Sequence, residues 1–144
     1  MQLQGGWFLF ALLSAIFAAA TSILAKIGIK GVDSNLATAI RTIVITLFAW
    51  GIVFAQGSIK HISTLSKTTW IFLILSGFAT GLSWLFYFRA LQLGDASKVV
   101  PIDKLSLVLA VIMAVVFLHE KLTTATIVGS VLITAGVVVM AVFK

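Results

Sequence analysis

The chain has 144 residues, of which 61% are hydrophobic and 10% are charged, and its mean hydropathy is +1.21. Soluble domains carry about 25% charged residues, so this composition excludes a water-soluble fold and predicts one domain, residues 1–144, surrounded by a lipid bilayer. The net charge of +6 does not indicate nucleic acid as a partner, because the basic residues stand singly between apolar runs and do not cluster.

Five apolar stretches follow one another along the chain, at about residues 7–29, 36–55, 69–93, 97–118 and 124–143. Each has close to the roughly 20 residues that an α-helix needs to cross the hydrocarbon core of a bilayer. The connections are short, and residues 56–68 form the one substantial loop. The sequence therefore predicts an all-α membrane protein, a bundle of five transmembrane helices, with any function built among the helices.

The first stretch resembles a secretory signal, because its apolar run leads into the small residues Ala18, Ala19 and Ala20. A signal peptide also begins with a basic segment, and residues 1–6 contain neither Lys nor Arg. We therefore expect the first helix to be retained as an uncleaved span.

Nothing in the sequence predicts a metal site, a cofactor or a catalytic centre. There is no cysteine, and His61 and His119 both lie near span ends without a second ligand at metal spacing. A phosphate-binding glycine motif and a nucleophile–base set at familiar spacing are also missing from the sequence. An enzyme is therefore not expected.

The basic residues give a prediction of orientation. Five spans put the N-terminus on the side with three basic residues, whereas the side of the C-terminus receives seven: Lys26, Lys30, Arg41, Arg89, Lys98, Lys104 and Lys144. Cytoplasmic loops are enriched in Lys and Arg, so this count favours an N-terminus outside and a C-terminus in the cytoplasm, in a prokaryotic-type plasma (inner) membrane. Four of the seven lie inside predicted helices, and without them the count is three against three. Insertion in both orientations therefore stays open.

Small residues occur at the spacing that lets membrane helices approach closely. Gly77 and Gly81 form a GxxxG motif in the third stretch, and Gly129 belongs to a similar series in the fifth. These residues predict helix packing, either within the chain or across a dimer seam.

An aromatic group lies well inside the third stretch. Tyr87 and Phe88 follow Trp84 at the i+3 and i+4 positions, which places all three on one helix face. This helix face has two interpretations. It packs against other helices or contacts lipid, or it lines a substrate pathway.

The fourth stretch carries two charged residues, Asp103 and Lys104, about 9–10 Å along the helix from Ser97. Adjacent residues point about 100° apart on a helix, so the two are not expected to pair with each other. Lys104 can reach the headgroups, but Asp103 needs a partner, which Arg41, Arg89, Lys26 or a second subunit could supply. Pro101 either begins this helix in its first turn or kinks it beside Asp103.

The segments Ala90–Ser106, Phe117–Thr123 and Gly129–Gly136 resemble the EamA-type branch of the drug/metabolite transporter superfamily, in particular its short members with a single five-helix unit. Arg41 early in the second stretch also fits that family. Many long relatives carry a proline where this chain has Leu107, so details of their cavity are not transferred by position.

The resemblance implies transport of a small-molecule substrate. Most relatives contain two such units of opposite orientation around a central cavity, so a homodimer, with an antiparallel arrangement as the hypothesis, would supply the missing half. We expect a secondary transporter or exporter of small metabolites, amino acids or drugs. The alternatives are a small multidrug-resistance-like proton antiporter that uses Asp103, and an accessory membrane subunit that transports nothing. The substrate-pathway candidates are Asp103, Lys104, Arg41, Arg89, Trp84, Tyr87 and Pro101.

Overall fold

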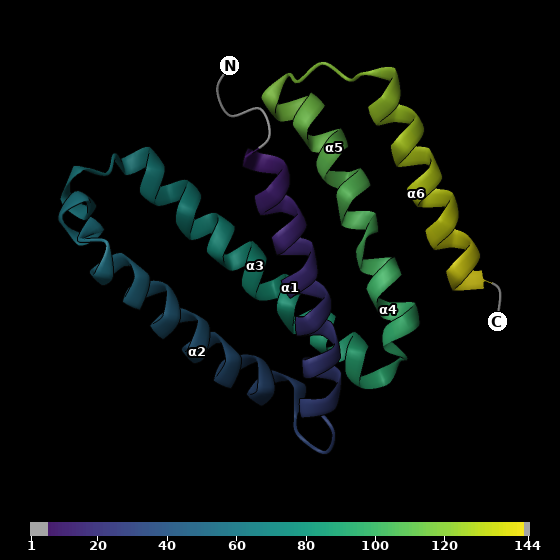
Figure 1. Ribbon diagram of the computed structural model, residues 1–144, viewed down its shortest axis with the longest axis horizontal. Helices are drawn as coiled ribbons and strands as arrows, with labels where there is room; N and C mark the ends of the chain where they lie inside the picture. The colour runs from purple at the N-terminus through teal and green to yellow at the C-terminus, as the bar shows by residue number, and fades with distance from the viewer. Residues whose placement is uncertain (1–5, 143–144) are drawn as a thin grey trace. The chain divides into compact units, whose positions relative to one another are not determined.

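The computed structural model describes residues 6–142, and within this range it contains helices and no strand. In chain order these are α1 (Gly6–Gly28), α2 (Ser34–Ala55), the short 3₁₀-helix η1 (Ser58–Thr64), α3 (Lys67–Leu93), α4 (Ala96–Asp103), α5 (Leu105–Leu118) and α6 (Thr124–Val142) (Figure 1). Residues 1–5, which carry most of the argument against a signal peptide, and residue 143, the predicted end of the fifth stretch, lie outside the described residues.

Five helical segments of the described chain are long and apolar enough to cross a membrane, with α4 and α5 together counting as one segment, Ala96–Leu118. These segments coincide closely with the five apolar stretches of the sequence. The prediction of an all-α membrane protein is therefore confirmed.

Short polar side chains fix the starts of three helices. The Asp33 carboxylate accepts the backbone N–H groups of Asn35 and Leu36 at 2.9 and 3.0 Å, at the start of α2. The Ser66 hydroxyl accepts the N–H of Thr69 before α3, and the Thr123 hydroxyl accepts the N–H of Thr126 before α6. These bonds satisfy N–H groups that have no partner within the helix, so the loop residues set where each span begins.

The α2–α3 connection is more ordered than a plain loop. Gly57 takes the left-handed conformation, with φ of 65°, and η1 follows it. Since only glycine adopts this conformation without strain, Gly57 lets the chain turn back on the end of α2. The turn leaves an apolar hollow of about 290 Å³ that Trp50, Val53, His61, Ile62 and their neighbours line.

The fourth span is interrupted at Lys104. Pro101 is the sixth residue of α4, so it does not begin the helix. It has no N–H to give to the carbonyl of Ser97, and its ring crowds that carbonyl. Three residues later the backbone hydrogen bonds span three residues instead of four. The N–H of Lys104 donates to the carbonyl of Pro101, and the N–H of Leu107 donates to the carbonyl of Lys104, both at 3.0 Å. The question of whether Pro101 begins or disturbs the helix is thus settled in favour of a disturbed helix.

The chain divides into two compact units. The first contains residues 1–22 and 93–144, where α6 runs beside both α4 and α5 (Figure 1). The second, residues 23–92, contains the end of α1 with α2, η1 and α3. Its buried apolar residues gather where α1 and α3 end, and they include Ala25, Ile29, Phe88 and Leu91. That all five helices form a single domain stays a prediction.

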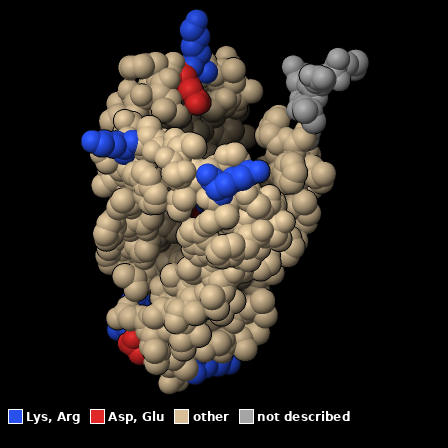
Figure 2. Space-filling model, turned by 90° about the vertical axis from the view of Figure 1, so that its left-hand side faces the viewer, with Lys and Arg blue, Asp and Glu red and all other residues tan. Residues whose placement is uncertain are grey.

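The outer surface is apolar. Phe10, Phe48, Phe86 and Phe117 are each at least 70% exposed, and long aliphatic side chains accompany them on every transmembrane helix. Figure 2 shows a face on which uncharged residues predominate and Lys, Arg, Asp and Glu are few. Such a surface is stable in contact with lipid chains and not in water.

Candidate functional site

Arg41 and Phe88 form the centre of the candidate site, in the second unit. The guanidinium carbon of Arg41, on α2, lies 4.0 Å from the centre of the Phe88 ring, on α3. Phe88 is 2% exposed and Leu91, one turn further along, is completely buried. The arginine therefore rests on the most buried turn of α3, where a cation is attracted to the face of an aromatic ring.

Arg41 lies well inside the span. It is the eighth residue of α2, about 10 Å along the axis from Ser34 at 1.5 Å per residue. Its Nη1 atom is buried and has no hydrogen-bond partner among the described residues. The Tyr87 phenol is within electrostatic range of the guanidinium, and its ring stands 5.4 Å from that of Phe88 at an interplanar angle of 68°.

Two further cations flank the same end of α3. Lys26 Nζ, from the last turns of α1, donates to the carbonyl of Leu91 at 2.6 Å. Arg89 Nη1 donates to Gln92 Oε1 at 2.7 Å, and Gln92 Nε2 donates to the carbonyl of Val32 at 2.7 Å. These bonds tie the ends of α1 and α3 and the loop before α2 together. They also hold positive charge against neutral oxygen atoms.

This unit has an excess of positive charge. Residues 23–92 contain six basic residues and one acidic residue, Asp33. Both measured bonds of the Asp33 carboxylate go to backbone N–H groups at the start of α2. The site around Arg41 can therefore hold an anion, because burial makes a compensating negative charge favourable.

The charged residues Asp103 and Lys104, in the first unit, are arranged differently from our prediction. Lys104 Nζ lies 3.3 Å from Asp103 Oδ2, so the two adjacent residues do pair. The prediction considered only the directions of the two Cβ atoms, whereas a lysine stem is long and flexible enough to bend back to its neighbour. The side chains are 53% and 35% exposed, and such a pair contributes little stability.

The other predicted pathway residues are distributed between the two units. Tyr87 and Arg41 come together in the second unit, where Trp84 is half-buried one turn before Phe88. Arg89 lines an open groove of about 500 Å³ together with Asp33, Ser34 and Asn35. Pro101 lies in the first unit, before the interruption beside Asp103. The roles of all these residues in transport stay predictions.

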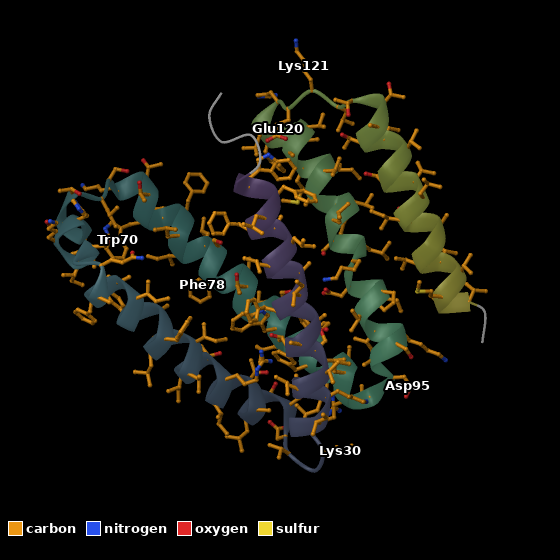
Figure 3. All side chains as sticks on the ribbon, viewed as in Figure 1. Lys30, Trp70, Phe78, Asp95, Glu120 and Lys121 are labelled. Atoms are coloured by element: carbon orange, nitrogen blue, oxygen red, sulfur yellow. The ribbon has the colours of Figure 1, made fainter. Side chains whose placement is uncertain are left out.

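The glycines expected to pack helices lie in open positions. A Cβ atom built on Gly77, Gly81 or Gly129 would meet no neighbouring atom within 4 Å. Gly77 and Gly81 line a hollow of about 410 Å³ on α3 with Ile74, Phe78, Leu82 and Leu85. Figure 3 shows Phe78 on α3, between Trp70 and the later turns of the helix. The helix-packing role stays a prediction, and it now points to a partner outside the unit.

The turn between α5 and α6 ends one helix and leads into the next. His119 adopts the left-handed conformation, with φ of 54°, and the N–H groups of His119 and Glu120 both reach the carbonyl of Ala114. Glu120 and Lys121 follow in the linker, and Lys121 extends away from both helices (Figure 3). Among residues 6–142 no three His, Cys, Asp or Glu side chains lie together as metal ligands would.

Sequence reasoning did not identify Phe88 as the support of Arg41, or Gln92 as the residue that bonds the loop before α2. The sequence signal for Phe88 was its place three residues before Leu91, on the face that becomes buried. For Gln92 it was a polar side chain in the last turn of a long apolar helix. Neither signal identifies the residue that is contacted, Arg41 for Phe88 and Val32 for Gln92.

Comparison with known proteins agrees with the family resemblance of the sequence motifs. The family described as the EamA-like transporter family matches residues 5–142. A protein of Sinorhizobium sp, named an uncharacterized transporter in the cobO 3' region, is 50% identical over 137 residues, which cover 95% of this chain and 97% of that protein. No solved structure matches the chain. These matches confirm the resemblance inferred from the sequence motifs.

Proposed function

The chain belongs to the EamA-like transporter family, and on that premise we propose that it is a secondary transporter that moves a small organic molecule by alternating access. It is a multi-pass integral membrane protein, and both the family and the relative point to a transporter and not to an enzyme. The proposed substrates are small metabolites, amino acids or drugs, and the proposed location is the plasma (inner) membrane of a prokaryote.

The observation that carries this proposal is Arg41. An arginine inside a transmembrane helix costs about 2.5–3.5 kcal/mol on insertion scales, so it is retained where it faces a partner or a watery cavity. Arg41 is turned toward buried Phe88 on a neighbouring helix, about 10 Å from the start of α2. A charge in that position is typical of a substrate or ion pathway.

We propose that the working form is a homodimer, with antiparallel subunits as the preferred arrangement. One five-helix unit corresponds to half of the inverted-repeat architecture that encloses a substrate site in many transporters. The open glycine face of α3 is a surface on which a second copy can approach closely. Without the four basic residues that lie inside the helices, the two ends of the spans carry three basic residues each, and this balance supports insertion in both orientations.

Transport is tested with the purified protein in liposomes, loaded in turn with labelled amino acids, organic acids, organic cations and sugars. We expect saturable flux of at least one class, and we expect Arg41→Gln to reduce it about 10- to 100-fold. Copurification of another membrane protein, with no flux from any class, would instead favour the accessory-subunit alternative.

The dimer is tested independently. The chain contains no cysteine, so single-cysteine variants can be made in the natural sequence and crosslinked in native membranes. A cysteine at Ile74 or Phe78, on the open face of α3, should give a crosslinked dimer. A cysteine at Val131, 61% exposed on α6, is the control for random collision. Monomer alone under all conditions would reject the dimer.

No observation favours the proton-antiporter alternative. It needs Asp103 as a carboxylate that exchanges a proton, whereas Asp103 is paired with Lys104 at 3.3 Å.

A further inference from the structure

We propose that Arg41 binds the carboxylate of an amphipathic organic anion, and that this kind of anion is the substrate class of the protein. The inference rests on the transport function proposed above and adds to it the chemistry that the site selects. It depends on the orientation of Arg41, on its free hydrogen-bonding capacity and on the charge and aromatic surroundings of the second unit.

The orientation of Arg41 is the first argument. An arginine within about 10 Å of the end of a span can extend to the headgroups and leave its charge in water. Arg41 instead places its guanidinium 4.0 Å from the ring centre of Phe88, which is 2% exposed. The guanidinium therefore lies against the most buried turn of α3.

The hydrogen-bonding capacity of Arg41 is the second argument. A guanidinium has five N–H donors in a planar fork, and Nη1 is buried without a hydrogen-bond partner among the described residues. The contact with Phe88 places Arg41 Cζ 4.0 Å from the ring centre, and it is an attraction between the charge and the ring face rather than a hydrogen bond to an oxygen or nitrogen atom. Two parallel N–H groups match the two oxygen atoms of a carboxylate, which is the planar anion that arginine binds best.

The balance of charge is the third argument. Residues 23–92 contain six basic residues, and one of them, Arg89 at the end of α3, donates to the neutral amide oxygen of Gln92. The one acidic residue of the unit, Asp33, caps α2. The site thus favours a ligand that brings negative charge and disfavours an organic cation.

The aromatic residues of this unit indicate that the ligand also has an apolar part. Tyr87 stands against Phe88 at 5.4 Å, and half-buried Trp84 lies one turn further from the loop end of α3. Aromatic rings offer an apolar surface with polar edges, which suits a hydrocarbon or aromatic body attached to a carboxylate. We therefore infer an anion with an apolar body and not a small inorganic anion.

The test measures binding apart from transport, in the full-length protein purified in uncharged maltoside micelles. The probes are benzoate and hexanoate, each compared with its own amide, and the readout is the midpoint of thermal unfolding (Tm) as the probe is titrated. We expect each carboxylate to raise Tm at about 10- to 100-fold lower concentration than its amide, which is the ratio that a charged hydrogen-bonded pair gives.

Three variants assign the effect to Arg41. Arg41→Gln should remove the preference for the carboxylate, and Arg41→Lys, which keeps the charge but loses the planar fork, should weaken it by about tenfold. Lys30→Gln removes the same charge from an exposed loop position of the same unit and should keep the preference. If Arg41→Gln does not give a folded, monodisperse protein, the comparison of Arg41→Lys with Lys30→Gln decides the question.

Two results would overturn the inference. The first is equal Tm shifts with carboxylate and amide, or a preference that survives at Arg41→Gln. The second is an Arg41-dependent Tm shift with added phosphatidylglycerol but none with benzoate or hexanoate, which would make the site a lipid phosphate site. A carboxylate that binds through Arg41 but is not moved in proteoliposomes would leave the binding site standing and reject the transport function.

Discussion

Two charged positions inside the spans of this protein, Lys104 and Arg41, differ in how their charge is compensated. Lys104, beside the interruption of the fourth span, has a carboxylate 3.3 Å away on the preceding residue, and its side chain is 53% exposed. Arg41 has no acidic partner within its own unit and rests on the buried ring of Phe88. A locally neutralised pair can be structural, whereas a cation held on an apolar support and left with free donors is prepared for an external anion.

The largest expected difference between the two positions concerns transport. Arg41→Gln should reduce flux about 10- to 100-fold, since it removes a charged hydrogen-bonding partner of the substrate. Lys104→Gln should reduce flux by no more than about fivefold, because a half-exposed ion pair contributes at most about 1 kcal/mol. Initial rates in proteoliposomes at matched protein density measure both. A loss at Lys104 as large as the loss at Arg41 would show that the two positions belong to one pathway.

The second prediction concerns the support beneath Arg41. Phe88→Leu removes the aromatic face under the guanidinium and leaves a gap in the most buried turn of α3. We expect a loss of about 1–3 kcal/mol in the free energy of unfolding, from the cation–π contact and from packing together.

The control for this prediction is Phe86→Leu, a change of the same chemistry on the same helix at a position 73% exposed. It should alter the free energy of unfolding by less than about 0.5 kcal/mol. Unfolding of both variants in mixed micelles, followed by circular dichroism, measures the difference. Equal losses in the free energy of unfolding would mean that the contact of Phe88 with Arg41 contributes nothing specific to stability.

The sequence was sufficient for the helices but not for the contacts between them. Span positions depend on the length of apolar runs, and span starts depend on residues such as Asp33 and Thr123, so both are local properties that the sequence contains. The contact of Arg41 with Phe88 joins residues on two helices, and no local pattern specifies which helices meet or in which register. The same is true of Gln92 and the carbonyl of Val32.

The charged pair at Asp103 and Lys104 was wrongly predicted for a different reason. An ideal helix geometry was applied to a segment that Pro101 interrupts, and to a lysine whose stem has four rotatable carbons. Side-chain length and helix irregularity thus matter more than angular spacing for adjacent charged residues. The partner expected for Asp103 was on another helix or in a second subunit, whereas the structure pairs it with Lys104.

The third prediction extends the comparison to the open face of α3. A Cβ atom at Gly77 would meet no neighbouring atom within 4 Å among the described residues, so Gly77→Leu should leave the monomer folded. A close helix–helix seam in a dimer would be blocked, and the dimer should weaken by about tenfold. Crosslinking yield from a cysteine at Ile74, measured at increasing lipid dilution, reports this change. Gly28→Leu, which also meets nothing within 4 Å but lies in the last turn of α1, is the matched control.

The smallest effect is expected from Asp103→Asn, and it is the sharpest test of the contrast between the two positions. If Asp103 serves only Lys104, the variant leaves a lysine that can extend to the headgroups, and flux should change by no more than about twofold. Complete loss of flux together with loss of proton coupling would instead identify Asp103 as the exchanging carboxylate of an antiporter.

A third outcome of Asp103→Asn would change the view of Arg41. If Asp103 were the counter-ion of Arg41 in the membrane, the variant would leave Arg41 without a carboxylate, and benzoate would bind more tightly than to the natural chain. The double variant Asp103→Asn with Arg41→Gln would then recover part of the free energy of unfolding that the single variant loses, because a charge inside the membrane is destabilising when its partner charge is removed. Independent effects of the two substitutions are expected here, because each residue already has the contact that holds it, Lys104 for Asp103 and Phe88 for Arg41.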